Sequence, residues 1–443
     1  RRVLFRSAIN LALPLSNNLP HLSTLGLDLI MEGTTPEAVD EASDRERFEA
    51  FSQRNDLRMP NGQTASTPDE VREAVREIGY PVLIRPSYVL GGRGMEILSS
   101  NRQLETYMDD AFLSPEKPLL VDEYLGNAVE LDVDAVCDGR EVLVGAIMEH
   151  LEEAGIHSGD STCFIPPQNV SENILKQVDE WTRRIGLELG IRGCYNIQFA
   201  IRDEILYVLE VNPRGSRTFP FVAKATGVPL ARIAAMVALG EKLSDLNIPK
   251  PQNDAVCVKA PVFPFIKLRG LDPAPGPEMK STGEVMGSHE RASAAYLKAR
   301  LATESPVPTE GGVYITVKDK DKDSIINQAK SLIDLGFKLY ATRGTANVLR
   351  DKGGLEVKTC YRITEGMTPD ALDLMRQGKI HLIINTPRNT GGAVLDGNMM
   401  RRLAVELNIP FVTTMAGARM EVLAIAEAMD GIPEPRLLEI GTL

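Results

Sequence analysis

The segment 195–214 constrains the fold of this chain most, because its pattern predicts two neighbouring strands joined by a turn at residues 202–204. Side chains two positions apart on a strand point to the same face, so Glu210 and Asn212 project together. An even-sum pairing register places Gln198 on that face as well. Side-chain oxygens grouped in this way, with an arginine at the end of the segment, suit a hard divalent cation that holds phosphates. The segment therefore predicts the metal and nucleotide floor of a phosphoryl-transfer site.

Length and charge narrow the class of protein. A chain of 443 residues should hold two or three domains, each with its own core. Hydrophobic residues at 43% and charged residues at 25% are typical of a soluble globular protein. The net charge of −12 argues against a general nucleic-acid surface, so we expect no nucleic-acid partner. A phosphorylated substrate is still compatible with this charge, because local arginines and lysines decide such binding.

The cysteines and the apolar runs indicate a compartment. The five cysteines are dispersed and contain no CxxC pair, which favours reduced thiols in the cytoplasm over a disulfide frame or a zinc site. No apolar run approaches the ~20 residues needed to cross a bilayer, so we expect no membrane partner. The N-terminal apolar run is broken by Pro14 and does not resemble a signal peptide.

The order of predicted elements suggests four parts. The start of the chain leads directly into a helix at 8–14 without a preceding strand, so residues 1–43 are expected to be the remnant of an earlier domain. Residues 44–302 would form one domain and residues 313–443 another. The segment 303–312 mixes Pro, Gly and small polar residues and is predicted to be the linker between them.

Residues 27–123 are predicted to alternate between short strands and helices. An edge strand is expected at 27–30, followed by a helix from Pro36 through Phe48. The next helix begins with a capping box, in which Thr67 is the N-cap, Pro68 is the first helical residue and Glu70 is the third. Buried strands are predicted at 80–85 and 119–123.

The middle of the chain and the last domain show different patterns. A strand-rich tract at 129–149 contains the turn Asp138-Gly139, and helices are predicted at 171–189 and 229–239. Four apolar residues of the first helix have the spacing of one buried face: Ile174, Val178, Trp181 and Ile185. Beyond the linker, strict alternation of strands and helices predicts a doubly wound, mostly parallel sheet. Its strands are expected at 313–317, 337–341, 355–360, 381–385 and 410–413.

Three further segments are candidate nucleotide contacts. Arg85 ends a strand before the glycine-rich loop 86–94, where glycines let backbone N–H groups approach phosphates. Backbone groups at 123–125 could read a purine edge, and Glu130 could accept ribose hydroxyls. The polar segment 155–161 could contact phosphate or substrate. Taken alone, the first segment is equally well explained as a plain turn, and the other two are better explained as a solvated strand end and a surface loop.

Taken together, these pieces resemble an ATP-grasp ligase, and more specifically the C-terminal half of the synthetase (large) subunit of carbamoyl-phosphate synthase. The resemblance is carried in order by the stretches 85–93, 130–135, 145–150, 154–161, 196–200, 210–214 and 281–287. The implied fold is α/β and α+β, with an ATP-grasp fold followed by a doubly wound, methylglyoxal-synthase-like regulatory domain.

The resemblance also implies a role for each matched position. The residues expected to bind ATP are Arg45, Arg85, Glu123, Leu125, Glu130, Gly155, Ile156, His157, Ser158, Gln198 and Glu210. Those expected to hold Mg²⁺ or Mn²⁺ are Gln198, Glu210 and Asn212. Those expected to act in catalysis are Arg85, Glu210 and Arg214, the last by stabilising the transferring phosphoryl group. Glu123 stands where some members of the family have histidine.

The implied reaction is the phosphorylation of carbamate by ATP to give carbamoyl phosphate, the final step of a synthesis that serves arginine and pyrimidine production. The implied partners are the N-terminal half of the large subunit, a glutaminase small subunit and an oligomeric assembly. Two alternatives are another ATP-grasp ligase, such as a biotin-dependent carboxylase subunit, and a nucleotide-sensing fragment without turnover. The segment 154–161 and the C-terminal unit speak against the carboxylase.

The last domain contains a predicted effector site. The segment 342–345 lies at the carboxyl end of a strand and opens a helix, which makes a cradle of N–H groups and hydroxyls for a phosphate. In the family, a regulatory nucleotide monophosphate binds at the matching positions, which are Lys322, Thr342, Thr345, Arg362 and Asn385. Ordinary helix caps are the alternative explanation. Phe411 replaces a tyrosine of ornithine-responsive members, and Pro387 replaces a threonine of some relatives.

Overall fold

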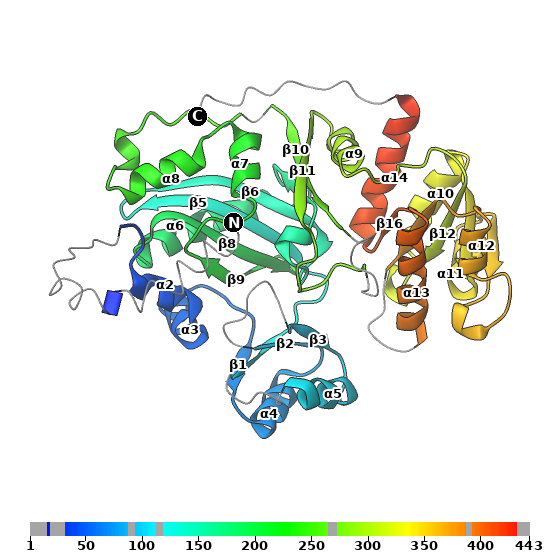
Figure 1. Ribbon diagram of the computed structural model, residues 1–443, viewed down its shortest axis with the longest axis horizontal. Helices are drawn as coiled ribbons and strands as arrows, with labels where there is room; N and C mark the ends of the chain where they lie inside the picture. Colours follow the sequence, from blue (N-terminus) through cyan, green and yellow to red (C-terminus); the bar gives the residue numbers. More distant parts are fainter. Residues whose placement is uncertain are drawn as a thin grey trace. The chain divides into compact units, whose positions relative to one another are not determined.

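The computed structural model describes residues 16–17, 32–86, 94–111, 118–252, 254–264, 273–386 and 392–431, without the side chains of 110–111 and 392–393 (Figure 1). The predicted helix 8–14, the edge strand 27–30, residues 87–93 of the glycine-rich loop and Pro387 therefore lie outside the described residues. The chain divides into two compact units. The first contains residues 1–150, 164–254 and 437–443, and the second contains 151–163 and 255–436.

Between residues 36 and 54 the first unit contains two helices where the sequence predicted one. They are α2 Pro36–Ser43 and α3 Arg45–Arg54. The break falls at Asp44, whose backbone is extended and whose carboxylate accepts the N–H of Arg47 at 3.0 Å. Asp44 is thus the N-cap of α3, and this local bond competes with continuation of α2.

A four-stranded antiparallel sheet in the order β1-β4-β2-β3 follows. Its strands are β1 Gly62–Ala65, β2 Val82–Pro86, β3 Glu96–Leu98 and β4 Leu119–Glu123. The helices α4 Pro68–Ile78 and α5 Asn101–Ala111 lie on one side of it (Figure 1). The predicted cap at Thr67 is confirmed, with its hydroxyl 3.3 Å from the N–H of Glu70. Glu70 accepts the N–H of Ser66 at 2.7 Å instead of that of the cap residue.

A second sheet of the first unit contains the strands β6-β5-β8-β9 in that order. Their bounds are β5 Val129–Asp138, β6 Val142–Glu153, β8 Arg192–Arg202 and β9 Ile205–Asn212, and the last three residues of β6 belong to the second unit. The predicted tract 129–149 is therefore the hairpin of β5 and β6. The helix α6 Glu172–Glu188 buries the predicted face, and α7 Phe219–Thr226 and α8 Leu230–Ala238 follow the sheet.

Alternation along β5 and β8 gives this sheet one apolar and one polar face. The odd positions of β5 from Leu131 to Cys137, and those of β8 from Tyr195 to Ile201, belong to the same core cluster as the buried face of α6. The even positions of both strands therefore point to the opposite face. Acidic and amide side chains occupy most of these even positions, so this polar face is where a site can form.

The hairpin of β8 and β9 contains a β-bulge that decides where Glu210 points. Near the turn, Phe199 lies opposite Val208, but the next pair is Gln198 with Glu210, so Leu209 is the extra residue. The prediction that Gln198 shares a face with Glu210 is confirmed, because the two residues lie directly opposite each other. The turn itself differs from the predicted three residues: Asp203 and Glu204 form a two-residue turn, both with positive φ, as a type I′ turn requires.

The second unit contains the antiparallel pair β10 Val256–Val262 and β11 Gly283–His289, with α9 Ala292–Ala302 after it. A five-stranded parallel sheet in the order β14-β13-β12-β15-β16 follows. Its strands are β12 Gly312–Thr316, β13 Lys338–Thr342, β14 Val357–Cys360, β15 Leu382–Asn385 and β16 Phe411–Val412. The five strands agree with the predicted ones.

Helices cover both faces of this parallel sheet, as a doubly wound fold requires (Figure 1). Residues of α10 Ile325–Asp334, α11 Arg343–Asp351 and α14 Met415–Asp430 share one core cluster with the strands. Residues of α12 Ala371–Arg376 and α13 Gly392–Glu406 share a second cluster with them. The predicted doubly wound domain is confirmed.

No single helix among the described residues combines the length and apolar character needed to span a bilayer. The helices α7 and α8 meet these criteria only when they are counted together across a bend of 117°.

One close contact fixes how α6 packs on β8. Gly186 of α6 faces the buried Tyr195, whose hydroxyl donates to the carbonyl of Thr182 at 2.8 Å. A Cβ at Gly186 would lie 2.5 Å from that hydroxyl oxygen. We expect Gly186→Ala to lower the free energy of unfolding by about 1–3 kcal/mol, although Ala ordinarily favours a helix by about 1 kcal/mol over Gly. Urea denaturation measures the change.

The matched control for this prediction is Gly186→Ala combined with Tyr195→Phe. Removing the hydroxyl removes the shorter of the two close contacts with Tyr195, because Cζ would still lie 2.9 Å from the Cβ. The double variant should therefore be more stable than the sum of the two single changes predicts. A stabilising effect of Gly186→Ala alone would contradict the close packing of α6 on β8.

Candidate nucleotide and metal site

The floor of the candidate site is the polar face of the β8–β9 hairpin. Gln198 and Glu210 lie opposite each other, and Asn212 lies two residues after Glu210. The Asn212 amide donates to Glu210 Oε1 at 2.8 Å, and Arg214 donates to Asn212 Oδ1 at 2.8 Å. The Glu210 side chain is 39% exposed, so its carboxylate is open to a ligand. The structure thus brings the three predicted ligand residues together beside the predicted catalytic arginine.

Two arginines reach this region from the first part of the unit. Asp122 of β4, which is 6% exposed, binds both: its Oδ1 is 2.9 Å from Arg45 Nη2, and its Oδ2 is 3.6 Å from Arg85 Nε. Arg85 Nη1 is also 4.0 Å from Glu210 Oε2. Sequence reasoning missed Asp122. The available signal was a carboxylate directly after the apolar run Leu119–Val121, before the end of the strand at Glu123.

The Glu123 side chain is held by neighbours within the first unit. Its Oε1 is 2.7 Å from Arg202 Nη2, and its Oε2 accepts from the Asn61 amide at 3.3 Å. Leu125 follows two residues later and is buried. With the carboxylate of Glu123 engaged, a ligand contact at 123–125 would have to come from backbone atoms, in line with the predicted reading of a purine edge.

The polar face continues into a buried network on β5. Glu130, Asp132 and Asp134 occupy alternate positions, and all three are buried. His150 of β6 lies between two of them, with Nδ1 3.7 Å from Glu130 Oε1 and Nε2 3.3 Å from Asp132 Oδ2. The Asn196 amide donates to Asp132 at 3.1 Å and to Asp134 at 3.0 Å. Of this network the sequence analysis singled out Glu130 alone, although acids at every second position of one strand were the visible signal.

Asp134 is the most deeply buried acid of the network, with 0% exposure. Its carboxylate accepts the Ser216 and Thr218 hydroxyls, both at 2.7 Å, in addition to the Asn196 amide. Burial, with a further contribution from the neighbouring Asp132 charge, raises the pKa of Asp134 to about 7 against the lowering effect of these hydrogen bonds.

The predicted nucleotide segment 155–158 belongs to the second unit, where its last residue begins the 3₁₀ turn η1 Ser158–Asp160. The N–H of His157 donates to the carbonyl of Gly276 at 2.9 Å, and His157 Nδ1 accepts the N–H of Gly159 at 3.0 Å. The buried Lys259 of β10 donates its ammonium to the carbonyl of Ser158 at 2.9 Å. The segment is therefore fixed at its C-terminal end by groups of the same unit.

The motif 281–287 takes part in this fixation. Asp160 is buried and accepts the N–H groups of Lys280 at 2.7 Å and of Ser281 at 2.9 Å. The Ser281 hydroxyl donates to the carbonyl of Gly159 at 2.8 Å. These hydrogen bonds give a physical reason for the presence of both stretches in one chain, because the motif 281–287 helps to fix the segment 154–161.

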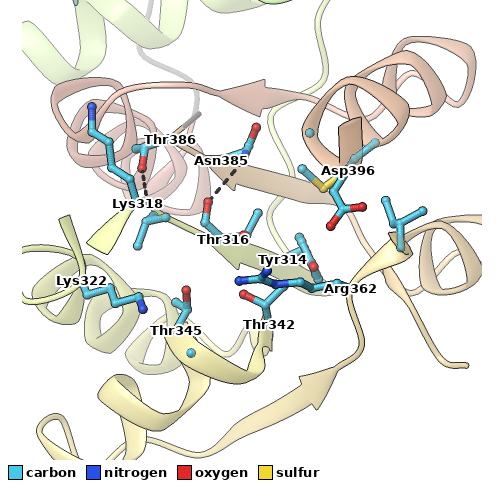
Figure 2. Close-up of a pocket in the computed structure, with 15 residues that line it drawn as sticks. Tyr314, Thr316, Lys318, Lys322, Thr342, Thr345, Arg362, Asn385, Thr386 and Asp396 are labelled. Atoms are coloured by element: carbon cyan, nitrogen blue, oxygen red, sulfur yellow. Dashed lines mark hydrogen bonds between the residues drawn. The ribbon is translucent and has the colours of Figure 1, made fainter. Parts of the chain in front are cut away.

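The five predicted effector residues line one pocket at the carboxyl end of the parallel sheet: Lys322, Thr342, Thr345, Arg362 and Asn385. Figure 2 shows the cationic ends of Lys322 and Arg362 directed toward the same space as the hydroxyls of Thr342 and Thr345. The helix α11 begins here without a side-chain cap, so its first N–H groups are available. A Cβ at Gly344 would lie 3.0 Å from Lys322 Nζ, so a larger residue there would displace the ammonium group.

The pocket wall contains residues that the sequence analysis did not assign, among them Thr316, Lys318, Thr386 and Asp396. The Thr386 hydroxyl accepts the N–H of Lys318 at 2.9 Å (Figure 2). The ammonium of Lys318 is 3.1 Å from Glu153 Oε1, at the end of β6. This ion pair connects the pocket wall with the residue that stands two positions before Gly155.

The buried Arg401 sets the amide orientation of Asn385. It donates to Asn385 Oδ1 at 2.6 Å, and Asn385 Nδ2 donates to the carbonyl of Thr316 at 3.3 Å. The Asn385 side chain is thus held in one rotamer at the pocket wall.

The candidate metal ligands are one carboxylate and two amides. Such oxygen donors fit Mg²⁺ or Mn²⁺ better than zinc. In the part of the chain that the structure describes, no three His, Cys, Asp or Glu side chains gather as a metal cluster.

Two family models match the chain. Residues 44–246 match the carbamoyl-phosphate synthase L chain, ATP binding domain, and residues 324–413 match the MGS-like domain. The chain is 46% identical to the carbamoyl phosphate synthase large chain, C-terminal section, of Methanocaldococcus jannaschii, over 96% of this chain and 69% of that protein. It is 47% identical to the carbamoyl phosphate synthase large chain of Methanothrix thermoacetophila, over 96% of this chain and 39% of that protein.

Solved structures with low sequence identity share the fold. A carboxyaminoimidazole ribonucleotide synthase from Aspergillus clavatus, complexed with ATP, matches with a TM-score of 0.53 and 16% identity, over 64% of this chain and 77% of that one. A biotin carboxylase domain from Hydrogenobacter thermophilus matches with a TM-score of 0.52 and 16% identity, over 68% of this chain and 76% of that one. The predicted ATP-grasp fold followed by a methylglyoxal-synthase-like domain is confirmed by the family models and this fold.

The pKa of Asp134 leads to a prediction about stability. In the folded chain this pKa is about 7, and in the unfolded chain it returns to about 3.8. Between pH 4 and 7 the folded chain therefore binds one more proton than the unfolded chain, so the free energy of unfolding falls as pH rises through this window. We expect a fall on the order of a few kcal/mol, measured by urea denaturation at pH 5 and pH 8.

Asp134→Asn removes this titration and should flatten the pH dependence. Asp179→Asn, which changes an exposed acid of the same unit, is the control and should keep the slope of the unchanged chain. An identical slope in the chain and in Asp134→Asn would show that Asp134 is ionised throughout the window.

Proposed function

Because this chain belongs to the family of carbamoyl phosphate synthase large chains, we propose that it phosphorylates carbamate with ATP to form carbamoyl phosphate and ADP. The chain spans 39% of the length of the full-length relatives and 69% of the separate C-terminal section. The observation that supports the reaction most is the pairing of Gln198 with Glu210 on a polar face, with Asn212 and Arg214 hydrogen-bonded beside them.

In this reaction a carbamate oxygen forms a bond to the γ-phosphorus of ATP, while the bond from that phosphorus to the β,γ-bridging oxygen breaks and ADP leaves. Charge spreads over the equatorial phosphoryl oxygens, so positioning and neutralisation supply most of the catalysis. Arg85 and Arg214 would neutralise this charge. Asp122 binds Arg45 and Arg85 in advance, which lowers the entropy lost when the arginines meet phosphate.

The residues Gln198, Glu210 and Asn212 would hold Mg²⁺ or Mn²⁺ through their side-chain oxygens. A bound divalent cation neutralises phosphate charge and orients the triphosphate. Glu130 would accept ribose hydroxyls, and the backbone at 123–125 would read the purine edge. The contacts of the segment 155–158 with ATP stay a prediction.

The proposal extends to the rest of the enzyme. A preceding N-terminal half would make carbamate, a glutaminase small subunit would supply ammonia, and the assembly would be oligomeric, in a pathway that leads to arginine and pyrimidines. A cytoplasmic location is part of the proposal. It is supported by the absence of any disulfide at the five cysteines, all of which lie within the described residues.

The pocket in the second unit would bind a regulatory nucleoside monophosphate. Lys322, Thr342 and Thr345 surround the N-terminus of α11, where N–H groups and the helix dipole favour a phosphate. Arg362 and Asn385, which line the same pocket, would contact the sugar or base.

The first test of the reaction is ATP synthesis from ADP and carbamoyl phosphate by the purified chain with Mg²⁺. Glu210→Gln removes the carboxylate of the ligand set, so we expect the rate to fall by a factor on the order of 100 or more. Glu204→Gln, which changes the exposed turn of the same hairpin, is the matched control and should keep the rate.

Full activity in Glu210→Gln would show that the metal assignment is wrong. An unchanged chain that binds ATP and a nucleoside monophosphate but transfers no phosphoryl group would support the sensing-fragment alternative instead.

The effector pocket is tested by calorimetric titration with UMP and IMP. Lys322→Met removes a charge-assisted contact with the phosphate, so we expect the Kd of the bound nucleotide to rise about ten- to a hundredfold. Lys352→Met, at an exposed ion pair with Asp323 in the same unit, should leave the Kd unchanged. Equal Kd values for the chain and for Lys322→Met would place the phosphate elsewhere.

A further inference from the structure

We infer that Asp134 is a positioning residue that ties the turn carrying Arg214 to the strand carrying Gln198. The inference rests on the proposed function, because it assigns a task in phosphoryl transfer to a buried acid outside the predicted site residues. It is derived from the hydrogen bonds that Asp134 accepts from two different segments.

The first segment is the turn between β9 and α7. Arg214 stands at its start, and Ser216 and Thr218 follow at every second position. Both hydroxyls donate to the Asp134 carboxylate at 2.7 Å, one to each oxygen, and the two hydroxyl oxygens are 2.9 Å apart. Ser216 Oγ also accepts the N–H of Phe219 at 3.0 Å, where α7 begins. The turn is thus fixed by side-chain bonds that converge on one buried group.

The second segment is β8. Asn196 donates to Asp134 at 3.0 Å and stands two residues before Gln198 on the same face of the strand. It lies opposite Asn212, so it also adjoins the other strand of the hairpin. A single carboxylate therefore contacts the strand that carries one metal ligand and the turn that carries the catalytic arginine.

The energetic cost of this arrangement indicates a purpose beyond packing. A fully buried carboxylate next to a second buried acid, Asp132, is expensive to desolvate, and an apolar residue in its place would avoid that cost. Three converging hydrogen bonds offset part of it and define one geometry. A displacement of about 1 Å at a catalytic group can lower a rate about a hundredfold, so fixing the Arg214 turn has a clear benefit.

The experiment compares Asp134→Asn, Thr218→Val and the double variant in ATP synthesis from ADP and carbamoyl phosphate. Arg214 acts on charge that develops in the transition state, so kcat should fall about tenfold or more while KM for ADP changes less than about threefold. Because both changes break the same connection, the double variant should lose little more than Asp134→Asn alone. Equal losses in kcat and KM, or fully additive losses, would overturn the inference.

Glu149→Gln is the matched control. Glu149 is also a buried acid of the first unit, and it also accepts three hydrogen bonds from one loop, donated by Gln168 and Asn169. That loop carries no predicted site residue, so Glu149→Gln should change kcat less than about threefold. A loss as large as that of Asp134→Asn would show that any buried acid of this sheet has the same effect.

A second measurement does not depend on activity. Trypsin cleaves after Arg214 and Arg217, and release of the turn in Asp134→Asn should accelerate cleavage at both sites about tenfold, as followed by mass spectrometry of the native chain. Glu149→Gln should not accelerate it. Unchanged cleavage in Asp134→Asn would overturn the inference, whereas faster cleavage in a chain without phosphoryl transfer would retain the positioning role and reject the proposed function.

Discussion

The geometry of the candidate site depends on one irregularity in the hairpin of β8 and β9. A two-residue turn at 203–204 sets a register in which Gln198 would face Leu209, and Glu210 would point into the core against α6. The bulge at Leu209 changes that register by one residue. Core residues on β9 accordingly switch from even positions, at Leu206 and Val208, to an odd position at Val211. A local change in pairing therefore moves a carboxylate from a buried apolar face to a half-exposed polar one.

The polar face that results is stabilised as a network, because isolated acids could not be buried there. Glu130, Asp132 and Asp134 would repel one another if all were ionised without partners. His150 lies between two of them, and Asn196 bridges Asp132 and Asp134. Each of these three acids thus contacts a residue of a neighbouring strand, so the same bonds hold the sheet and the site residues. Glu210 differs from these acids because it is half-exposed. One of its carboxylate oxygens makes only a weak ion pair, 4.0 Å from Arg85.

The sequence predicted most elements because their patterns are local. The buried face of α6 follows from apolar spacing, and the five parallel strands follow from alternation with helices. The break at Asp44 was missed because the residues on both sides of it continue a helical pattern. Asp44 itself is more favourable as the N-cap of a helix than inside one. Asp122 was missed for a different reason: its partners stand far away along the chain. Arg85 meets it through the pairing of β4 with β2, and Arg45 reaches it from α3. The carboxylate on a buried strand was a local signal, but the identity of its partners had none.

The second unit joins two features that the sequence placed in different domains. The segment 151–163 belongs to the same unit as the parallel sheet, and Lys318 at the pocket wall is paired with Glu153 at the end of β6. Beyond Gly155, Asp160 and Lys259 hold the other end of the predicted nucleotide segment through buried hydrogen bonds. A displacement at the pocket wall would therefore reach the segment at Glu153 while its far end stays fixed. The strain would fall on the stretch between these two anchors, which includes residues 155–158 that the resemblance assigns to the nucleotide.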